Sequence, residues 1–138
     1  MEPVRRRLLV LVVEDNGTDV FVIKRVLQEC GLDRHVHVAT DGQQALFYLE
    51  NLSEDPLSPA PALVLLDLNL PKVSGIQVLR QLRAGRWRQI PVIIVTSSVS
   101  EGDRRAAQAL GAEAYFQKPD DLGAYMELAD VIKRILAK

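Results

Sequence analysis

Five short apolar segments alternate along the chain with stretches in which apolar residues recur every three or four positions. Four of these segments are apolar runs, 8–13, 63–67, 91–96 and 114–117, and in the other, at 36–38, Val36 and Val38 alternate with His35 and His37. The stretches with helical spacing are 18–30, 45–52, 76–83, 100–110 and 122–136. Regular alternation of strands and helices, joined by right-handed crossovers, predicts an open parallel sheet with helices on both faces.

The expected strand order is 2-1-3-4-5, the common order for a doubly wound sheet of five strands. The sequence therefore predicts a flavodoxin-like α/β fold with five helices. A length of 138 residues fits a single domain, 1–138, with a core at about 8–136. The proline-rich stretch 51–62 is expected to be an extended surface loop before the third strand.

Composition and charge exclude several classes of protein. The formal net charge of −1 gives no general attraction to nucleic acid or to an anionic membrane. Three arginines precede an apolar run at the start, but only six apolar residues come before Glu14, which is too short for a secretion signal. The single cysteine, Cys30, excludes an internal disulfide. We expect a cytoplasmic protein without direct nucleic-acid or membrane partners.

Polar residues follow four of the predicted strands where each strand ends. They are Glu14 and Asp15, Asp67, Thr96 and Ser97, and Lys118. In the order 2-1-3-4-5 the strands that carry them are neighbours, so these side chains are expected to meet at one edge of the sheet. His35 and His37 lie on the outer strand, and an exposed strand face is expected for them rather than a metal site.

Three carboxylates in one crevice need compensation. At about 4 Å and an effective dielectric constant near 20, each pair repels by about 4 kcal/mol. Mg²⁺ suits such a site because it takes oxygen ligands and is usually held by one or two carboxylates plus a phosphate. Lys118 adds a compact positive charge. The residues predict a seat for a phosphoryl group with Asp67 at its centre.

The chain resembles a receiver domain, the phosphoacceptor module of two-component response regulators. The motifs that carry the resemblance are VVEDN with Glu14 and Asp15, LLDLNLP with Asp67, VTSS with Thr96, and YFQKP with Lys118. The resemblance extends over about 8–136. It implies a stand-alone signalling protein, not an enzyme, that accepts a phosphoryl group on Asp67 from a histidine kinase or a phosphotransfer protein.

The resemblance also implies a role for each site residue. Glu14, Asp15 and Asp67, with the backbone carbonyl of Asn69, would hold Mg²⁺. Thr96 and Lys118 would each pair with a phosphoryl oxygen.

Three further residues match positions of the same family. Tyr115 matches the aromatic residue whose ring swings inward when Thr96 moves. Pro119 would follow a cis peptide bond, and Gly75 matches the turn after the acceptor strand.

The predicted signalling surface consists of the fourth helix, the fifth strand and the last helix. The fourth helix has few apolar residues to anchor it, so it can shift when a dianion arrives beside Thr96. The last helix carries a wide apolar stripe, which makes a homodimer through this surface possible. The residues that widen the stripe are Met126, Ala129, Val131 and Leu136.

Two other functions remain open from the residues alone. A phosphatase of the haloacid dehalogenase type also uses an aspartate and Mg²⁺, but it places a second acid two residues later, where this chain has Asn69. A flavin carrier of the same fold needs a hydroxyl-rich loop after the first strand, and EDNGTD is too acidic. The long 51–62 loop resembles that of receivers partnered with bacterial phytochrome kinases, whereas Asp120 and Asp121 depart from the common pattern.

Overall fold

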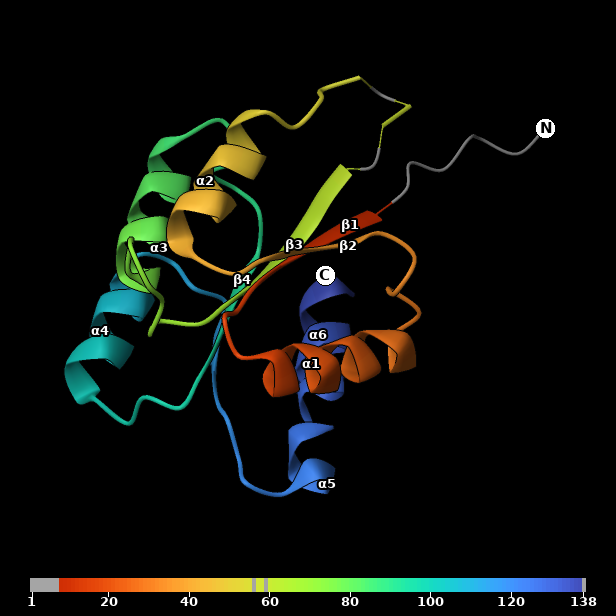
Figure 1. Ribbon diagram of the computed structural model, residues 1–138, viewed down its shortest axis with the longest axis vertical. Coiled ribbons are helices and arrows are strands. Elements are labelled where there is room, and N and C mark those ends of the chain that lie inside the picture. Colours follow the sequence, from red (N-terminus) through yellow and green to blue (C-terminus); the bar gives the residue numbers. More distant parts are fainter. Residues whose placement is uncertain (1–7, 56, 59, 138) are drawn as a thin grey trace.

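The computed structural model describes residues 8–55, 57–58 and 60–137. Its centre is a five-stranded parallel sheet in the order β2-β1-β3-β4-β5, as predicted (Figure 1). The strands are β1 (Leu8–Val13), β2 (Val36–Ala39), β3 (Ala60–Leu66), β4 (Val92–Thr96) and β5 (Ala114–Gln117). The predicted doubly wound α/β fold is confirmed.

Helices cover both faces of the sheet (Figure 1). They are α1 (Gly17–Glu29), α2 (Gly42–Glu50), α3 (Gly75–Ala84), α4 (Glu101–Ala109), α5 (Leu122–Tyr125) and α6 (Leu128–Leu136). Helices α1, α5 and α6 lie on one face, and α2, α3 and α4 lie on the other. This layering follows from alternation along each strand: Val10 and Val12 face the first group, whereas Leu11 and Val13 face the second.

Strand β3 and the last helix differ notably from the predicted elements. Strand β3 begins at Ala60 rather than Leu63, because its backbone pairs with that of β1 from Leu8 onward. The last helix is interrupted at Met126 and Glu127, where backbone hydrogen bonds span three residues in place of four. Gly123 lowers the helix propensity of the short α5, and apolar periodicity does not report this effect.

The predicted cis peptide bond before Pro119 is wrong. The Lys118–Pro119 bond is trans in the structure. Trans is the intrinsic preference of an X–Pro bond by about 0.5–1 kcal/mol, and Lys118 reaches the acidic residues without a cis bond.

Arg83, on the last turn of α3, holds the end of α4 in place. Its guanidinium donates hydrogen bonds of 2.9 Å to the carbonyls of Leu110 and Gly111, which follow α4. It also donates to the carbonyls of Arg88 and Ile90, at 2.9 and 2.8 Å, in the loop before β4. The planar guanidinium thus provides hydrogen bonds to carbonyls at the end of α4 that have no partner within the helix.

Candidate functional site

Asp67 follows β3 directly and lies at the carboxyl edge of the sheet. It is 4% exposed, and its backbone N–H donates to the carbonyl of Val13 at 3.0 Å. Its side-chain Oδ1 accepts a hydrogen bond from the backbone N–H of Asn69 at 3.1 Å. The carboxylate is therefore held with one oxygen engaged by its own loop and the other directed at Lys118.

Lys118 is the positive centre of the site. Its Nζ atom lies 2.7 Å from Glu14 Oε1, 3.0 Å from Asp67 Oδ2 and 3.0 Å from Asp19 Oδ2. These contacts bring together residues from the ends of β1, β3 and β5 and from the first turn of α1. The predicted meeting of Glu14, Asp67 and Lys118 at one edge of the sheet is confirmed.

Asp19 and Tyr125 complete the cluster, and sequence reasoning missed both. Besides its contact with Lys118, Asp19 accepts a hydrogen bond from the Tyr125 hydroxyl through Oδ1 at 3.2 Å. Asp19 lies in the first turn of α1, just after Glu14 and Asp15, and an acid at the helix start beside the site was a signal for its position. Tyr125 carried no comparable signal, because its apolar neighbours indicated only a core aromatic.

Burial and charge shift the pKa values of three groups here. Burial raises the pKa of Glu14 from 4.5 to about 7; the nearby Asp67 adds to this, and the Lys118 ammonium opposes it. Burial acts to lower the pKa of Lys118, but hydrogen bonds to Glu14, Asp67 and Asp19 outweigh it and raise that pKa. Burial and the charge of Asp19 raise the pKa of Tyr125.

The acidic residues fit a divalent cation. Glu14, Asp15 and Asp67 each offer a carboxylate oxygen, and these atoms lie within 4.8 Å of one another. Glu14 Oε1 is buried and, among the described residues, has no hydrogen-bond partner of good geometry, although the Lys118 ammonium lies 2.7 Å away. That contact is an ion pair. An oxygen so placed is a natural ligand for a hard cation.

The two predicted switch residues are Thr96 on β4 and Tyr115 on β5. Both contact Ser98, in the loop that follows β4. Thr96 is fully buried, and its Oγ1 accepts a hydrogen bond from the Ser98 N–H at 3.3 Å. The Tyr115 hydroxyl donates to the carbonyl of Ser98 at 3.1 Å, and its ring lies under the Arg104 guanidinium at 4.4 Å. Ser98 therefore connects both residues to the start of α4.

Gly75 sets the shape of the loop after Asp67. A Cβ atom at this position would lie 2.2 Å from the carbonyl oxygen of Asp67 and 2.6 Å from the Cα of Leu68. Only glycine lets α3 begin so close to the acceptor strand.

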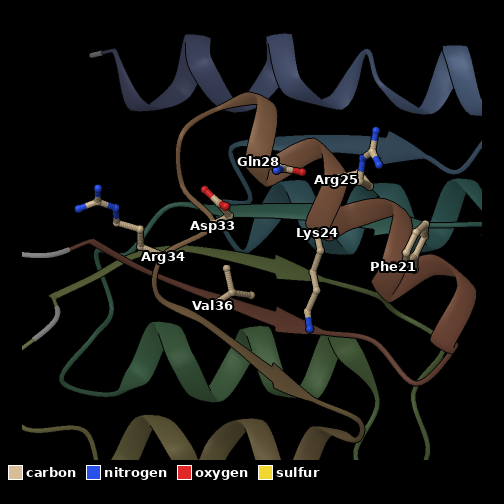
Figure 2. A pocket seen from close by; sticks show the side chains of 7 residues that line it. All are labelled: Phe21, Lys24, Arg25, Gln28, Asp33, Arg34 and Val36. Carbon is tan, nitrogen blue, oxygen red and sulfur yellow. The ribbon is translucent and has the colours of Figure 1, made fainter.

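Other polar features lie away from this cluster. His35 and His37 are partly buried rather than fully exposed, and the His37 ring stacks on Tyr48 at 3.7 Å. A hollow of about 380 Å³ lies on α1 and the segment before β2, and Figure 2 shows the side chains that line it. Its cations are Lys24, Arg25 and Arg34. In the described part of the chain, no helix is long and apolar enough to cross a membrane.

Known proteins share this sequence pattern. The family model of the response regulator receiver domain matches residues 10–130. The probable methanogenesis regulatory protein FilR2 of Methanothrix harundinacea is 40% identical over 112 residues, covering 80% of this chain and 72% of that protein. The response regulator Rcp1 of Synechocystis is 35% identical over 115 residues, covering 83% and 78%.

Solved structures share the fold. The Mn²⁺-bound form of Rcp1 superposes with a TM-score of 0.79 at 32% identity, covering 91% of each chain. The phosphorylated cyanobacterial phytochrome response regulator RcpA gives a TM-score of 0.82 at 28% identity, covering 96% of this chain and 95% of that one. With the acidic cluster and Lys118 at the same sheet edge, these matches show that the chain belongs to the response regulator receiver domain family.

Proposed function

We propose that Asp67 accepts a phosphoryl group from the phosphohistidine of a histidine kinase or phosphotransfer protein, with Mg²⁺ as cofactor. The observation that carries the proposal is the Asp67 carboxylate, 3.0 Å from the Lys118 ammonium and within 4.8 Å of oxygens from Glu14 and Asp15. A phosphoryl dianion needs both a nucleophile and concentrated positive charge, and this cluster has places for both.

Besides the two reacting groups, the transfer needs only a proton from water for the released imidazole. A carboxylate oxygen of Asp67 forms the new O–P bond as the P–N bond of phosphohistidine breaks. The electron pair of the broken bond stays on the imidazole nitrogen, which takes up a proton. Lys118, already beside Asp67, neutralises charge on the phosphoryl oxygens as they approach.

Glu14, Asp15 and Asp67 are the side chains that would hold the metal, with the carbonyl of Asn69 as the proposed fourth protein ligand. When bound, Mg²⁺ would neutralise the charge of the acids and of the transferring phosphoryl group. Glu14 faces Lys118 in the structure, so its oxygen has to serve the cation instead of the ammonium once the site is loaded.

The proposed switch begins at Thr96 and ends at α4. A new dianion offers the Thr96 hydroxyl a charge-assisted hydrogen bond in place of the Ser98 N–H. Moving Thr96 disturbs the Ser98 loop, to which the Tyr115 hydroxyl is bonded, and the start of α4 follows that loop. The arrangement supports signalling by a shift in protein contacts rather than by catalysis.

The similarity to Rcp1 and RcpA supports the proposal of a stand-alone receiver, 1–138, that works with a phytochrome-type histidine kinase. RcpA, a cyanobacterial phytochrome response regulator, supports that partner. A homodimer through α4, β5 and the last helix, here α5 and α6, also remains a proposal. Within the chain, Ala129 is buried, and Met126, Val131 and Leu136 pack against its core, so part of the apolar stripe is already covered.

Intact-mass spectrometry with acetyl phosphate and Mg²⁺ tests the proposal. We expect the chain to gain one phosphoryl group, and Asp67→Asn to gain none. Asp55→Asn, which alters an exposed loop acid, is the matched control and should be modified like the unaltered chain. An unaltered chain that stays unmodified, or an Asp67→Asn chain that is modified equally, would contradict the proposal.

A further inference from the structure

Asp19 contacts both the positive centre of the site and helix α5. Its Oδ2 lies 3.0 Å from Lys118 Nζ, and its Oδ1 accepts the hydrogen bond of the Tyr125 hydroxyl at 3.2 Å. Its side chain is 23% exposed, more than those of Glu14 and Asp67, so its charge is the least costly of the three to maintain. Asp19 does not belong to the group of acids that can share a cation.

Carboxylates surround the Lys118 ammonium in the resting structure: it donates hydrogen bonds to Asp67 and Asp19 and forms an ion pair with Glu14. It has three N–H donors and three carboxylate oxygens within 3.0 Å. Phosphorylation changes the partners unequally: Glu14 and Asp67 gain a metal and a phosphoryl group, whereas Asp19 gains neither. Asp19 is therefore the partner that still competes for the ammonium when a phosphoryl oxygen needs it.

We propose that Asp19 is a positioning residue of the phosphoacceptor site, which retains Lys118 in the resting protein and competes with the phosphoryl group for it. This inference rests on the proposed function of Asp67. It also implies a second path by which phosphorylation can affect the rest of the protein, because the Tyr125 hydroxyl on α5 donates a hydrogen bond to the same carboxylate. As Lys118 turns toward the phosphoryl group, the Asp19 carboxylate loses part of its contact with the ammonium, and its hydrogen bond with the Tyr125 hydroxyl changes.

Tyr125 is well placed to carry that change. Its side chain is 4% exposed, and its ring lies 6.0 Å from that of Phe116 on β5. Tyr125 is the last residue of α5, directly before the break that separates α5 from α6. A short helix that ends at a break can move without moving α6, whose buried residues anchor it to the sheet.

The first test is the rate of phosphorylation by acetyl phosphate at fixed Mg²⁺, followed by intact mass. Asp19→Asn keeps the side-chain size but removes the charge that competes for Lys118 and repels the donor. We expect a rate roughly three- to tenfold higher, the size of effect that one partly screened charge produces. Asp19→Glu restores the charge and should return the rate to within threefold of the unaltered chain.

Two results would overturn the competition. One is an Asp19→Asn rate within threefold of the unaltered chain or below it, with urea unfolding showing an intact fold. The other is an Asp19→Glu rate as high as that of Asp19→Asn, since charge would then not be the cause.

The second test uses beryllium trifluoride with Mg²⁺ as the phosphoryl mimic and compares amide NMR shifts. In the unaltered chain we expect shifts in both α4 and α5. Tyr125→Phe removes only the hydroxyl, so it should keep the α4 shifts and lose at least half of the α5 shifts. Unchanged α5 shifts in Tyr125→Phe would refute the route through Asp19. Absence of all shifts in the unaltered chain would instead count against the function proposed for Asp67.

Discussion

Helices α3 and α4 lie side by side on the same face of the sheet, yet they are held there in different ways. Helix α3 buries Gly75, Val78, Leu79 and Leu82, and Ser74 and Gln77 form a capping box at its start. Helix α4, one residue shorter, buries only Ala107. The helix after the acceptor strand is fixed by the core, whereas the helix after Thr96 is held mainly at its ends.

This difference has a physical consequence for signalling. Moving α3 would expose several apolar side chains, at roughly 25 cal/mol per Å² of apolar surface. Moving α4 disturbs a few polar contacts, such as the Ser98 hydroxyl with Asp103 at 2.7 Å. In the proposed switch, a charge change at Asp67 would therefore bias the second movement more easily than the first.

Removing the same side chain from each helix gives the largest expected effect. Leu79→Ala in α3 should lower the free energy of unfolding by about 2–5 kcal/mol, because Leu79 is fully buried. Leu110→Ala, at the partly buried end of α4, should cost about 1 kcal/mol. Urea unfolding measures both. Equal losses would mean that α4 is anchored as firmly as α3.

Adding one methyl group to each helix start gives the next effect. Gly75→Ala should destabilise by about 1–3 kcal/mol, since its Cβ would meet the Asp67 carbonyl at 2.2 Å. Gly102→Ala in α4 finds its nearest atom, Ser100 Oγ, at 3.6 Å, and should stabilise by about 0.5–1 kcal/mol. Urea midpoints of the two variants should therefore move in opposite directions. A shift in the same direction would break the comparison.

Titrating Glu14 separates global stability from the opening of α4. Because the folded pKa is raised from 4.5 to about 7, the folded state binds more protons in that range. Without Mg²⁺, stability should fall as pH rises through this window, by at most about 1.4 kcal/mol per pH unit, and the fall should vanish in Glu14→Gln. Protection factors from hydrogen exchange should follow this fall in α3 but not in α4.

A parallel fall in both helices would show that α4 opens only with the whole domain. An unaltered pH profile in Glu14→Gln would assign the titration to another group. Glu14→Gln also removes an anionic partner of Lys118. The double variant Glu14→Gln with Lys118→Met is therefore the control for the loss of that ion pair.

The smallest expected effect is at the helix caps. Ser74→Ala removes a capping box, and Ser100→Ala removes a single hydrogen bond to the Asp103 N–H at 3.2 Å. Each should cost about 1 kcal/mol, with Ser74 the larger. Exchange of α4 amides should accelerate in Ser100→Ala alone. If Ser74→Ala accelerates α4 as strongly, the two helices respond as one unit.

The strands and the meeting point of the site were predictable because they depend on local pattern and topology. Apolar runs identified four strands, alternation of Val36 and Val38 with two histidines identified the other, and the strand order brought Glu14, Asp67 and Lys118 to one edge. The weak anchoring of α4 was also visible, since its few apolar residues are a property of the sequence alone.

What could not be predicted depends on tertiary contacts. Tyr125 has the spacing of a core residue, and only the folded chain shows its hydroxyl beside Asp19. The break before α6 and the early start of β3 follow from local hydrogen bonding that apolar periodicity does not report. The trans bond before Pro119 differs from what the family resemblance implied.

If α4 shifts as proposed, the Arg83 guanidinium gives that shift a direction. It fixes the carbonyls just beyond the C-terminal end of the helix, so a rotation has its fulcrum there. Displacement then grows toward Glu101, at the end nearest Ser98 and Val99. Val99, which is 76% exposed, lies beside this end of α4. In the proposed shift, the largest displacement would therefore move an apolar side chain on the surface that a binding protein would contact.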